Sequence, residues 1–104
     1  MNRVFIKPEY LKMLTDIFDK FCPDAEIWAY GSRIKGDAHE GSDFDLVVKS
    51  YNSENKSFFE LKNLLSESNI PFFVDIHEFD KLPEYFQDEI TKDYVVLYNG
   101  GLVE

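Results

Sequence analysis

A short pattern between residues 31 and 46 combines residue types that phosphate chemistry requires. The turn Gly31-Ser32-Arg33-Ile34-Lys35-Gly36 is followed, after five intervening residues, by Ser42-Asp43-Phe44-Asp45-Leu46. Glycine lets the backbone approach phosphate oxygens closely, and backbone amides and hydroxyls can donate hydrogen bonds to them. In an extended strand, residues i and i+2 point to the same face, so Asp43 and Asp45 would present both carboxylates together. The pattern predicts a phosphate cradle beside a carboxylate pair.

A third aspartate, Asp75, lies within the apolar segment 72–77, which is typical of another strand. Three neighbouring carboxylates repel one another unless a cation neutralises them. Mg²⁺ suits such a site because it prefers hard oxygen ligands and is commonly bound by carboxylates plus substrate phosphates. Two ions roughly 3.5–4 Å apart would serve a displacement at phosphorus. We therefore predict that Asp43, Asp45 and Asp75 are catalytic and metal-binding, with Asp75 as the candidate general base.

The residues around the turn form the candidate nucleotide-binding set. Gly31 would allow close approach to the β- and γ-phosphates, and the amide and hydroxyl of Ser32 would donate to phosphate oxygens. Arg33 could offer a planar fork to phosphate, or could equally pair with one of the many surface acids. The predicted set consists of Gly31, Ser32, Arg33 and Ser42.

At these residues the chain resembles the minimal nucleotidyltransferases of the polymerase β-like superfamily. Their signature reads Gly-Ser, a short spacer, Gly, then Ser-Asp-x-Asp, and Val74-Asp75-Ile76 stands where their third aspartate lies. Ile34-Lys35 departs from the pattern, because alanine followed by arginine or leucine is frequent there. The resemblance covers essentially the whole chain, although its specificity resides in residues 31–46 and 75. It implies a nucleotidyltransferase fold and ATP as substrate.

A chain of this size also resembles the antitoxin half of HEPN–nucleotidyltransferase toxin–antitoxin pairs. That resemblance implies Mg²⁺-dependent transfer of AMP from ATP to a tyrosine hydroxyl of a HEPN-type toxin, with pyrophosphate leaving. The alternative is a non-catalytic, nucleotide-binding antitoxin that neutralises its partner by direct contact. Transfer to a small molecule such as an aminoglycoside is a third possibility, but related enzymes usually carry an added helical domain for that acceptor.

The same motifs also have simpler interpretations. Ser-Asp-x-Asp alone is typical of helix caps, turns and calcium loops. A calcium loop needs further oxygen ligands in the following residues, whereas Leu46-Val47-Val48 continues as an apolar strand. His77 alternates with Asp75 onto one face, which predicts a position near the site, although a lone histidine at a strand end is more often structural or solvent-facing.

Size and charge limit the classes of partner. The 104 residues fit a single domain, 1–104, with one modest core. The formal net charge of −9 repels a nucleic-acid backbone but is compatible with a mononucleotide carried by metal. The aromatic content of 16% can supply either core or a partner surface. Cys22 is the single cysteine and is expected to be a small thiol at a helix end, and the lack of a signal-like or membrane-length apolar run predicts a cytoplasmic protein.

Alternating helical and strand patterns predict an α/β domain with a mixed sheet covered by helices. One face of the strand at 43–49 should carry the catalytic carboxylates, and the other should pack on helices. A capping box at Ser57 and Glu60 predicts a helix start, and Asp80 is predicted to cap a last helix whose residues Leu82, Tyr85, Phe86 and Ile90 face inward. The predicted helices are 8–21, 32–37, from 57 and from 80 to about 91, and the predicted strands are 26–30, 43–49, 72–77 and 94–98.

Overall fold

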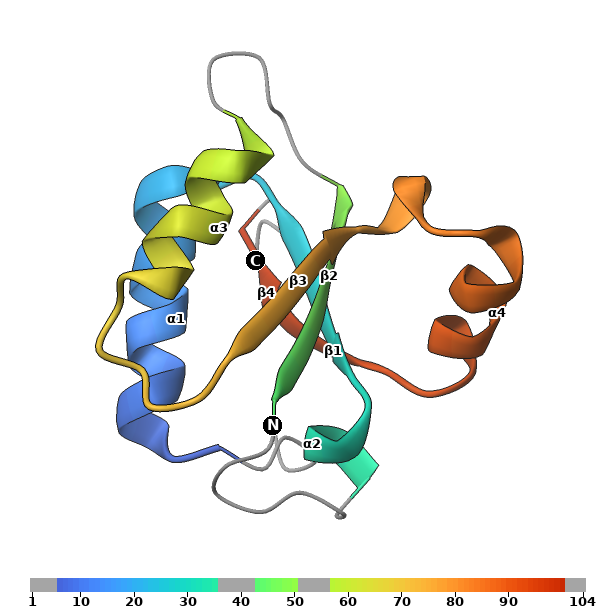
Figure 1. Ribbon diagram of the computed structural model, residues 1–104, viewed down its shortest axis with the longest axis horizontal. Coiled ribbons are helices and arrows are strands. Elements are labelled where there is room, and N and C mark those ends of the chain that lie inside the picture. The colour runs from blue at the N-terminus through green and yellow to red at the C-terminus, as the bar shows by residue number, and fades with distance from the viewer. Residues whose placement is uncertain (1–5, 36–42, 51–56, 101–104) are drawn as a thin grey trace.

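The computed structural model describes residues 6–35, 43–50 and 57–100. It contains a four-stranded sheet in the order β3-β2-β1-β4, with helices on both faces (Figure 1). The elements, in chain order, are α1 (Pro8–Phe21), β1 (Glu26–Tyr30), α2 (Ser32–Lys35), β2 (Phe44–Ser50), α3 (Phe58–Ser66), β3 (Val74–Glu78), a 3₁₀ turn (Phe79–Lys81), α4 (Glu84–Lys92) and β4 (Val95–Asn99).

The sheet is mixed, as the sequence predicts. Strand β1 pairs antiparallel with both β2 and β4, whereas β2 pairs parallel with β3. The parallel pair is possible because helix α3 carries the chain back between the two strands. The α/β class and the mixed sheet are therefore confirmed. None of the helices within the described ranges has the length and apolar character needed to cross a bilayer.

Two apolar clusters hold the helices against the sheet. The larger cluster joins α1 and α3 to one face, while a smaller one, made of Trp28, Val47, Phe79 and Ile90, lies beneath α4 on the other face. Figure 1 shows α1 and α3 on one side of the sheet and α4 on the opposite side. The face of β2 opposite Asp45 packs on α1 and α3, as predicted, and α4 covers part of the Asp45 face in addition.

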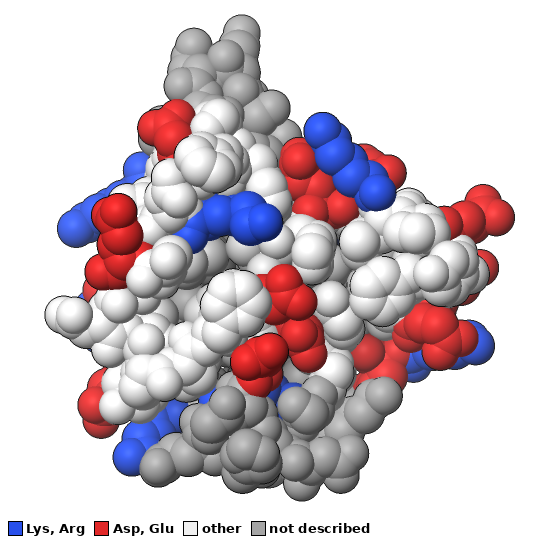
Figure 2. All heavy atoms as spheres, in the orientation of Figure 1, with Lys and Arg blue, Asp and Glu red and all other residues white. Residues whose placement is uncertain are grey.

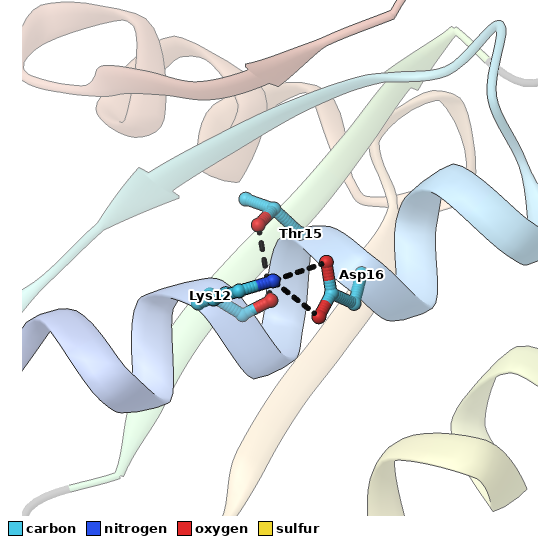
Figure 3. A network of polar contacts seen from close by, with 3 residues as sticks. All are labelled: Lys12, Thr15 and Asp16. Atoms are coloured by element: carbon cyan, nitrogen blue, oxygen red, sulfur yellow. Dashed lines mark hydrogen bonds and ion pairs between the residues drawn. The ribbon is translucent and has the colours of Figure 1, made fainter.

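Helix α1 matches its predicted bounds, starting with Pro8 in its first turn and burying Leu14, Phe18 and Phe21. Buried Cys22 caps its C-terminus, as expected. The solvent face carries an i, i+4 ion pair, in which the Lys12 ammonium lies 3.1 Å from Asp16 Oδ2 (Figure 3). Both side chains are more than half exposed, so this pair adds little to stability.

Helix α3 begins with the capping box that the sequence predicts. Ser57 Oγ accepts a hydrogen bond from the Glu60 amide at 3.1 Å, and the Glu60 carboxylate accepts one from the Ser57 amide at 3.3 Å. These contacts satisfy amides that the first helical turn would otherwise leave without partners.

We expect Ser57→Ala to lower the free energy of unfolding by about 1 kcal/mol, because the cap to the Glu60 amide is lost. Urea unfolding followed by circular dichroism measures the change. Ser66→Ala, at the exposed end of the same helix, is the matched control and should stay within about 0.5 kcal/mol of wild type. Equal losses in the two variants would contradict the capping role.

The predicted start of the last helix is wrong. Asp80 lies in the 3₁₀ turn, and α4 starts at Glu84 after Pro83, which occupies the N-cap position without a side-chain hydrogen bond. The cause is Pro83, since the residue before a proline is disfavoured in helical conformation and Leu82 is extended here. Tyr85, predicted to face inward, is 74% exposed, whereas Ile90 is buried as predicted.

The bounds of three strands also differ from the predicted ones. β2 starts at Phe44 rather than Asp43, β3 starts at Val74 rather than 72, and β4 spans Val95–Asn99. The Phe44 amide donates a hydrogen bond to the Phe73 carbonyl at 2.8 Å. The segment that leads into β3 therefore already lies beside β2 one residue before β3 begins. The two carboxylates of greatest interest, Asp45 and Asp75, remain inside their strands.

Candidate active site

Three polar side chains from adjacent strands form a row across one end of the sheet. In the strand register, Asp75 of β3 lies opposite Asp45 of β2, and Asp45 lies opposite Tyr30 of β1. Side chains at directly paired positions share a face of the sheet, which here is the face that carries α4. Figure 2 shows acidic side chains gathered near the middle of the visible surface, over β2 and β3.

The electrostatics of the site centre on Asp45. Partial burial, followed by the charges of Asp75 and Asp43, raises the pKa of the Asp45 carboxyl, and His77 acts weakly in the opposite direction. Asp43 lies just before β2 and is exposed, yet it is close enough to act on Asp45. The strand register thus places Asp45 opposite Asp75, and the charges of Asp75 and Asp43 both act on Asp45, a repulsion that a bound cation would relieve.

Gly31 stands directly against the Asp45 carboxylate. Its φ of +83° lies in the left-handed region, and a Cβ added there would sit 2.5 Å from Asp45 Oδ2. Glycine is therefore required both by the backbone conformation and by the space that the carboxylate occupies. The predicted turn begins at Gly31, directly after β1 ends at Tyr30. A group bound at the turn would therefore lie beside Asp45.

His77 lies next to Asp75, as its alternation predicts. His77 Nε2 is 3.0 Å from Asp75 Oδ1, and both side chains are a little over one third exposed. The imidazole therefore orients the carboxylate that sequence reasoning selected as the general base. In known metal sites, hydrogen bonds from neighbouring side chains fix the direction of a coordinating or proton-accepting oxygen in this way.

Tyr30 is a site residue that sequence reasoning missed. Burial and the charges of Asp45 and Asp75 raise the pKa of its hydroxyl to about 12, so the phenol is neutral at physiological pH. Its ring meets Phe86 of α4 edge to face, with ring centroids 6.0 Å apart. The available signal was its position immediately before Gly31, two residues from Trp28 on the same strand face.

Arg33 lies in a different environment from the one expected of a phosphate ligand. Only 6% of the residue is exposed, and its Cζ lies 4.4 Å from the centroid of the Phe72 ring. Burial lowers the pKa of the guanidinium. The contact with Phe72 is a cation–π interaction that ties α2 to the segment leading into β3. A phosphate contact by Arg33 stays a prediction.

Arg33→Ala should lower the free energy of unfolding by about 2 kcal/mol, because both the packing of the aliphatic stem and the contact with Phe72 are lost. Urea titration of the two proteins provides the measurement. Lys12→Ala is the control, because the Lys12 side chain is 76% exposed and pairs with Asp16 on the surface, and it should change stability by less than about 0.5 kcal/mol. A stable Arg33→Ala protein would contradict the structural role.

The carboxylates at this end of the sheet are ligands of the kind that a hard divalent cation prefers. Within the ranges that the structure describes, no three His, Cys, Asp or Glu side chains stand in a ready-made metal-binding arrangement. The chemistry nevertheless fits Mg²⁺, because Asp43, Asp45 and Asp75 supply carboxylate oxygens whose charges oppose one another at Asp45. The side chain of Ser32, and the predicted residues Gly36 and Ser42, lie outside the described part of the chain.

Two comparisons with known proteins match this region. The family model described as polymerase beta, nucleotidyltransferase matches residues 12–100, which include Gly31 and all three aspartates. A relative from Haemophilus influenzae (strain ATCC 51907 / DSM 11121 / KW20 / Rd), called probable protein adenylyltransferase MntA, is 39% identical over 95 residues. The alignment covers 88% of this chain and 82% of that relative. The resemblance inferred from residues 31–46 and 75 is therefore confirmed.

Proposed function

Because the chain belongs to the polymerase beta nucleotidyltransferases, we propose that it transfers AMP from ATP to a hydroxyl of a partner protein, with magnesium as cofactor. The observation that carries the proposal is the register of Asp45 against Asp75, with Gly31 beside Asp45. AMP as the transferred group is supported by the name of the H. influenzae relative, a probable protein adenylyltransferase. The class of enzyme, a nucleotidyltransferase, follows from the family itself.

The proposed reaction is a single displacement at the α-phosphorus of ATP. The acceptor oxygen forms a bond to that phosphorus, the bond to the bridging oxygen of pyrophosphate breaks, and the hydroxyl proton leaves to a base. Mg²⁺ bound by Asp43, Asp45 and Asp75 would neutralise phosphate charge and make the acceptor hydroxyl more acidic. Nucleoside monophosphate is thereby joined to the acceptor, and pyrophosphate is released.

The chain's own residues perform the remaining tasks. The missing Cβ at Gly31 lets the turn lie directly against the Asp45 carboxylate, so phosphates held by the turn's backbone would be next to that carboxylate. Asp75 receives the acceptor proton, and His77, at 3.0 Å, holds the accepting carboxylate in place. The neutral hydroxyl of Tyr30 can donate a hydrogen bond without adding a further negative charge to the site.

The proposed acceptor is a tyrosine of a HEPN-type toxin, and the chain acts as the antitoxin in the cytoplasm. The name of the H. influenzae relative, a probable protein adenylyltransferase, supports a protein acceptor. The net charge of −9 disfavours a nucleic-acid backbone as the acceptor. In this assignment, AMP attachment to the toxin is the event that silences it.

The test is a transfer assay with labelled ATP, Mg²⁺ and the product of the neighbouring gene. We expect label on the neighbour with wild-type protein, loss of label when Mg²⁺ is chelated, and loss of label with Asp43→Ala. Peptide mapping by mass spectrometry should place the added AMP on a tyrosine. Absence of label with the wild type, or equal labelling by Asp43→Ala, would contradict the proposal.

A further inference from the structure

A cavity opens beside the row of site residues, between the end of β1 and α4. Its volume is about 290 Å³. This lies at the lower end of small-molecule pockets, which are roughly 300–1,000 Å³, so it would hold part of a nucleotide rather than a whole one. Its lining includes Tyr30, Gly31, Tyr85, Phe86, Glu89 and Asp93.

The position of this cavity relative to the carboxylates determines which part of the reaction it can serve. Across the sheet the order is Asp75 on β3, Asp45 on β2, then Tyr30 on β1. If the acceptor meets Asp75, as the proposed function has it, the acceptor arrives from the β3 side. A nucleotide whose phosphates lie at Gly31 then extends in the other direction, toward the cavity.

We propose that this cavity is the nucleobase subsite and that it selects a base with an exocyclic amino group, such as adenine. This assignment rests on the proposed function. Its walls supply both interactions that a base needs. Tyr85 presents a ring that is 74% exposed, and Phe86 packs against Tyr30 beside it. Aromatic side chains of this kind stack on the face of a base.

The polar part of the wall matches an amino group rather than a carbonyl. Glu89 and Asp93 supply carboxylate oxygens, which only accept hydrogen bonds when ionised. Glu89 Oε2 already accepts from Lys92 at 2.8 Å, but a carboxylate has about four lone-pair positions and can accept from an amino group as well. The base is uncharged, so the acidic wall does not repel it as it would repel the phosphates.

The decisive experiment compares ATP and inorganic tripolyphosphate binding, each with Mg²⁺, by isothermal titration calorimetry on the full chain. Tyr85→Ala should weaken ATP binding about tenfold, as the loss of one stacking contact does, and should leave tripolyphosphate binding unchanged. Phe59→Ala is the matched control, because Phe59 is 69% exposed on α3, on the other side of the sheet. It should leave both affinities at their wild-type values.

A second measurement tests selection of the amino group. Wild-type protein should prefer ATP to the triphosphate of unsubstituted purine, and Glu89→Gln should reduce that preference, because the amide is a weaker acceptor. ATP affinity unchanged in Tyr85→Ala would overturn the base subsite. So would an equal loss for tripolyphosphate, or a weaker affinity for the partner protein alone, which would assign the cavity to the acceptor.

These outcomes separate the subsite from the proposed function. Normal AMP transfer together with wild-type ATP affinity in Tyr85→Ala rejects the subsite alone. A base-dependent loss of ATP affinity in Tyr85→Ala, without transfer to any protein, supports the subsite and rejects the proposed acceptor. Wild-type protein that binds no ATP rejects both.

Discussion

Asp45→Asn is expected to reduce AMP transfer by at least about a thousandfold, which corresponds to roughly 4 kcal/mol of lost transition-state stabilisation. The asparagine keeps the size of the side chain but removes the charge at the position where β1, β2 and β3 bring the site together. The labelled-ATP assay with the partner protein measures the loss. Asp16→Asn, a surface substitution on α1, is the control and should transfer AMP at the wild-type rate.

The same substitution should raise the stability of the metal-free protein. Burial and the charges of Asp75 and Asp43 raise the pKa of Asp45, so the ionised carboxylate is less favourable in the folded protein than in the unfolded chain. Its destabilising effect is absent below the unfolded-state pKa, about 3.9, and is complete above the raised folded-state pKa. The stability difference between Asp45→Asn and wild type should therefore grow as pH rises through this interval and stay constant at neutral pH.

Thermal unfolding with and without Mg²⁺ tests both parts of this expectation. Mg²⁺ should raise the Tm of wild-type protein, since a ligand that binds the folded state stabilises it, and should have little effect on Asp45→Asn. Asp45→Asn that is both less stable without metal and still stabilised by Mg²⁺ would exclude a charge-repelled cation site. If this variant still silenced the partner at wild-type potency, direct contact rather than AMP transfer would be the cause of that silencing.

The local parts of the fold could be predicted from the sequence where one residue type fixes the backbone. Pro8 and the apolar stripe set the bounds of α1, and the Ser57–Glu60 spacing set the start of α3. The start of α4 was missed because Asp80 is a good cap by composition, whereas Pro83 prevents Leu82 from being helical. The capping propensity of Asp80 therefore did not decide where the helix starts, because Pro83 restricts the backbone of Leu82.

The candidate site likewise has parts that the local sequence predicts and parts that only the tertiary structure shows. The shared face of Asp45 and Asp75 follows from alternation along their strands, whereas Asp43 lies before β2 and the catalytic and metal-binding roles of the three aspartates stay predictions. The contribution of α4 does not follow from any local pattern. Tyr85 looks like a core residue in a helical stripe, and only the packing of α4 over β1 places it at the rim of the cavity beside Gly31. Tertiary placement of one short helix thus decides what surrounds the phosphate turn.

Gly31→Ala should be the most damaging single substitution outside the carboxylates. The φ of +83° costs a residue with a Cβ about 1–2 kcal/mol, and the new Cβ would lie 2.5 Å from Asp45 Oδ2, so the carboxylate must move. We expect ATP binding and AMP transfer to fall at least a hundredfold, because a displacement of about 1 Å at reacting groups can cost that much. Calorimetry and the transfer assay provide the two measurements.

A double-mutant cycle separates the backbone cost from the collision with Asp45. In the Asp45→Ala background the collision partner is gone, so Gly31→Ala should lower the free energy of unfolding only by the left-handed backbone cost. In wild-type protein the loss should be larger, and the difference measures the coupling between the turn and the carboxylate. Equal losses in the two backgrounds would mean that the Asp45 side chain moves away from the added Cβ without lowering the free energy of unfolding. The close approach of this turn to the carboxylate would then not constrain the site.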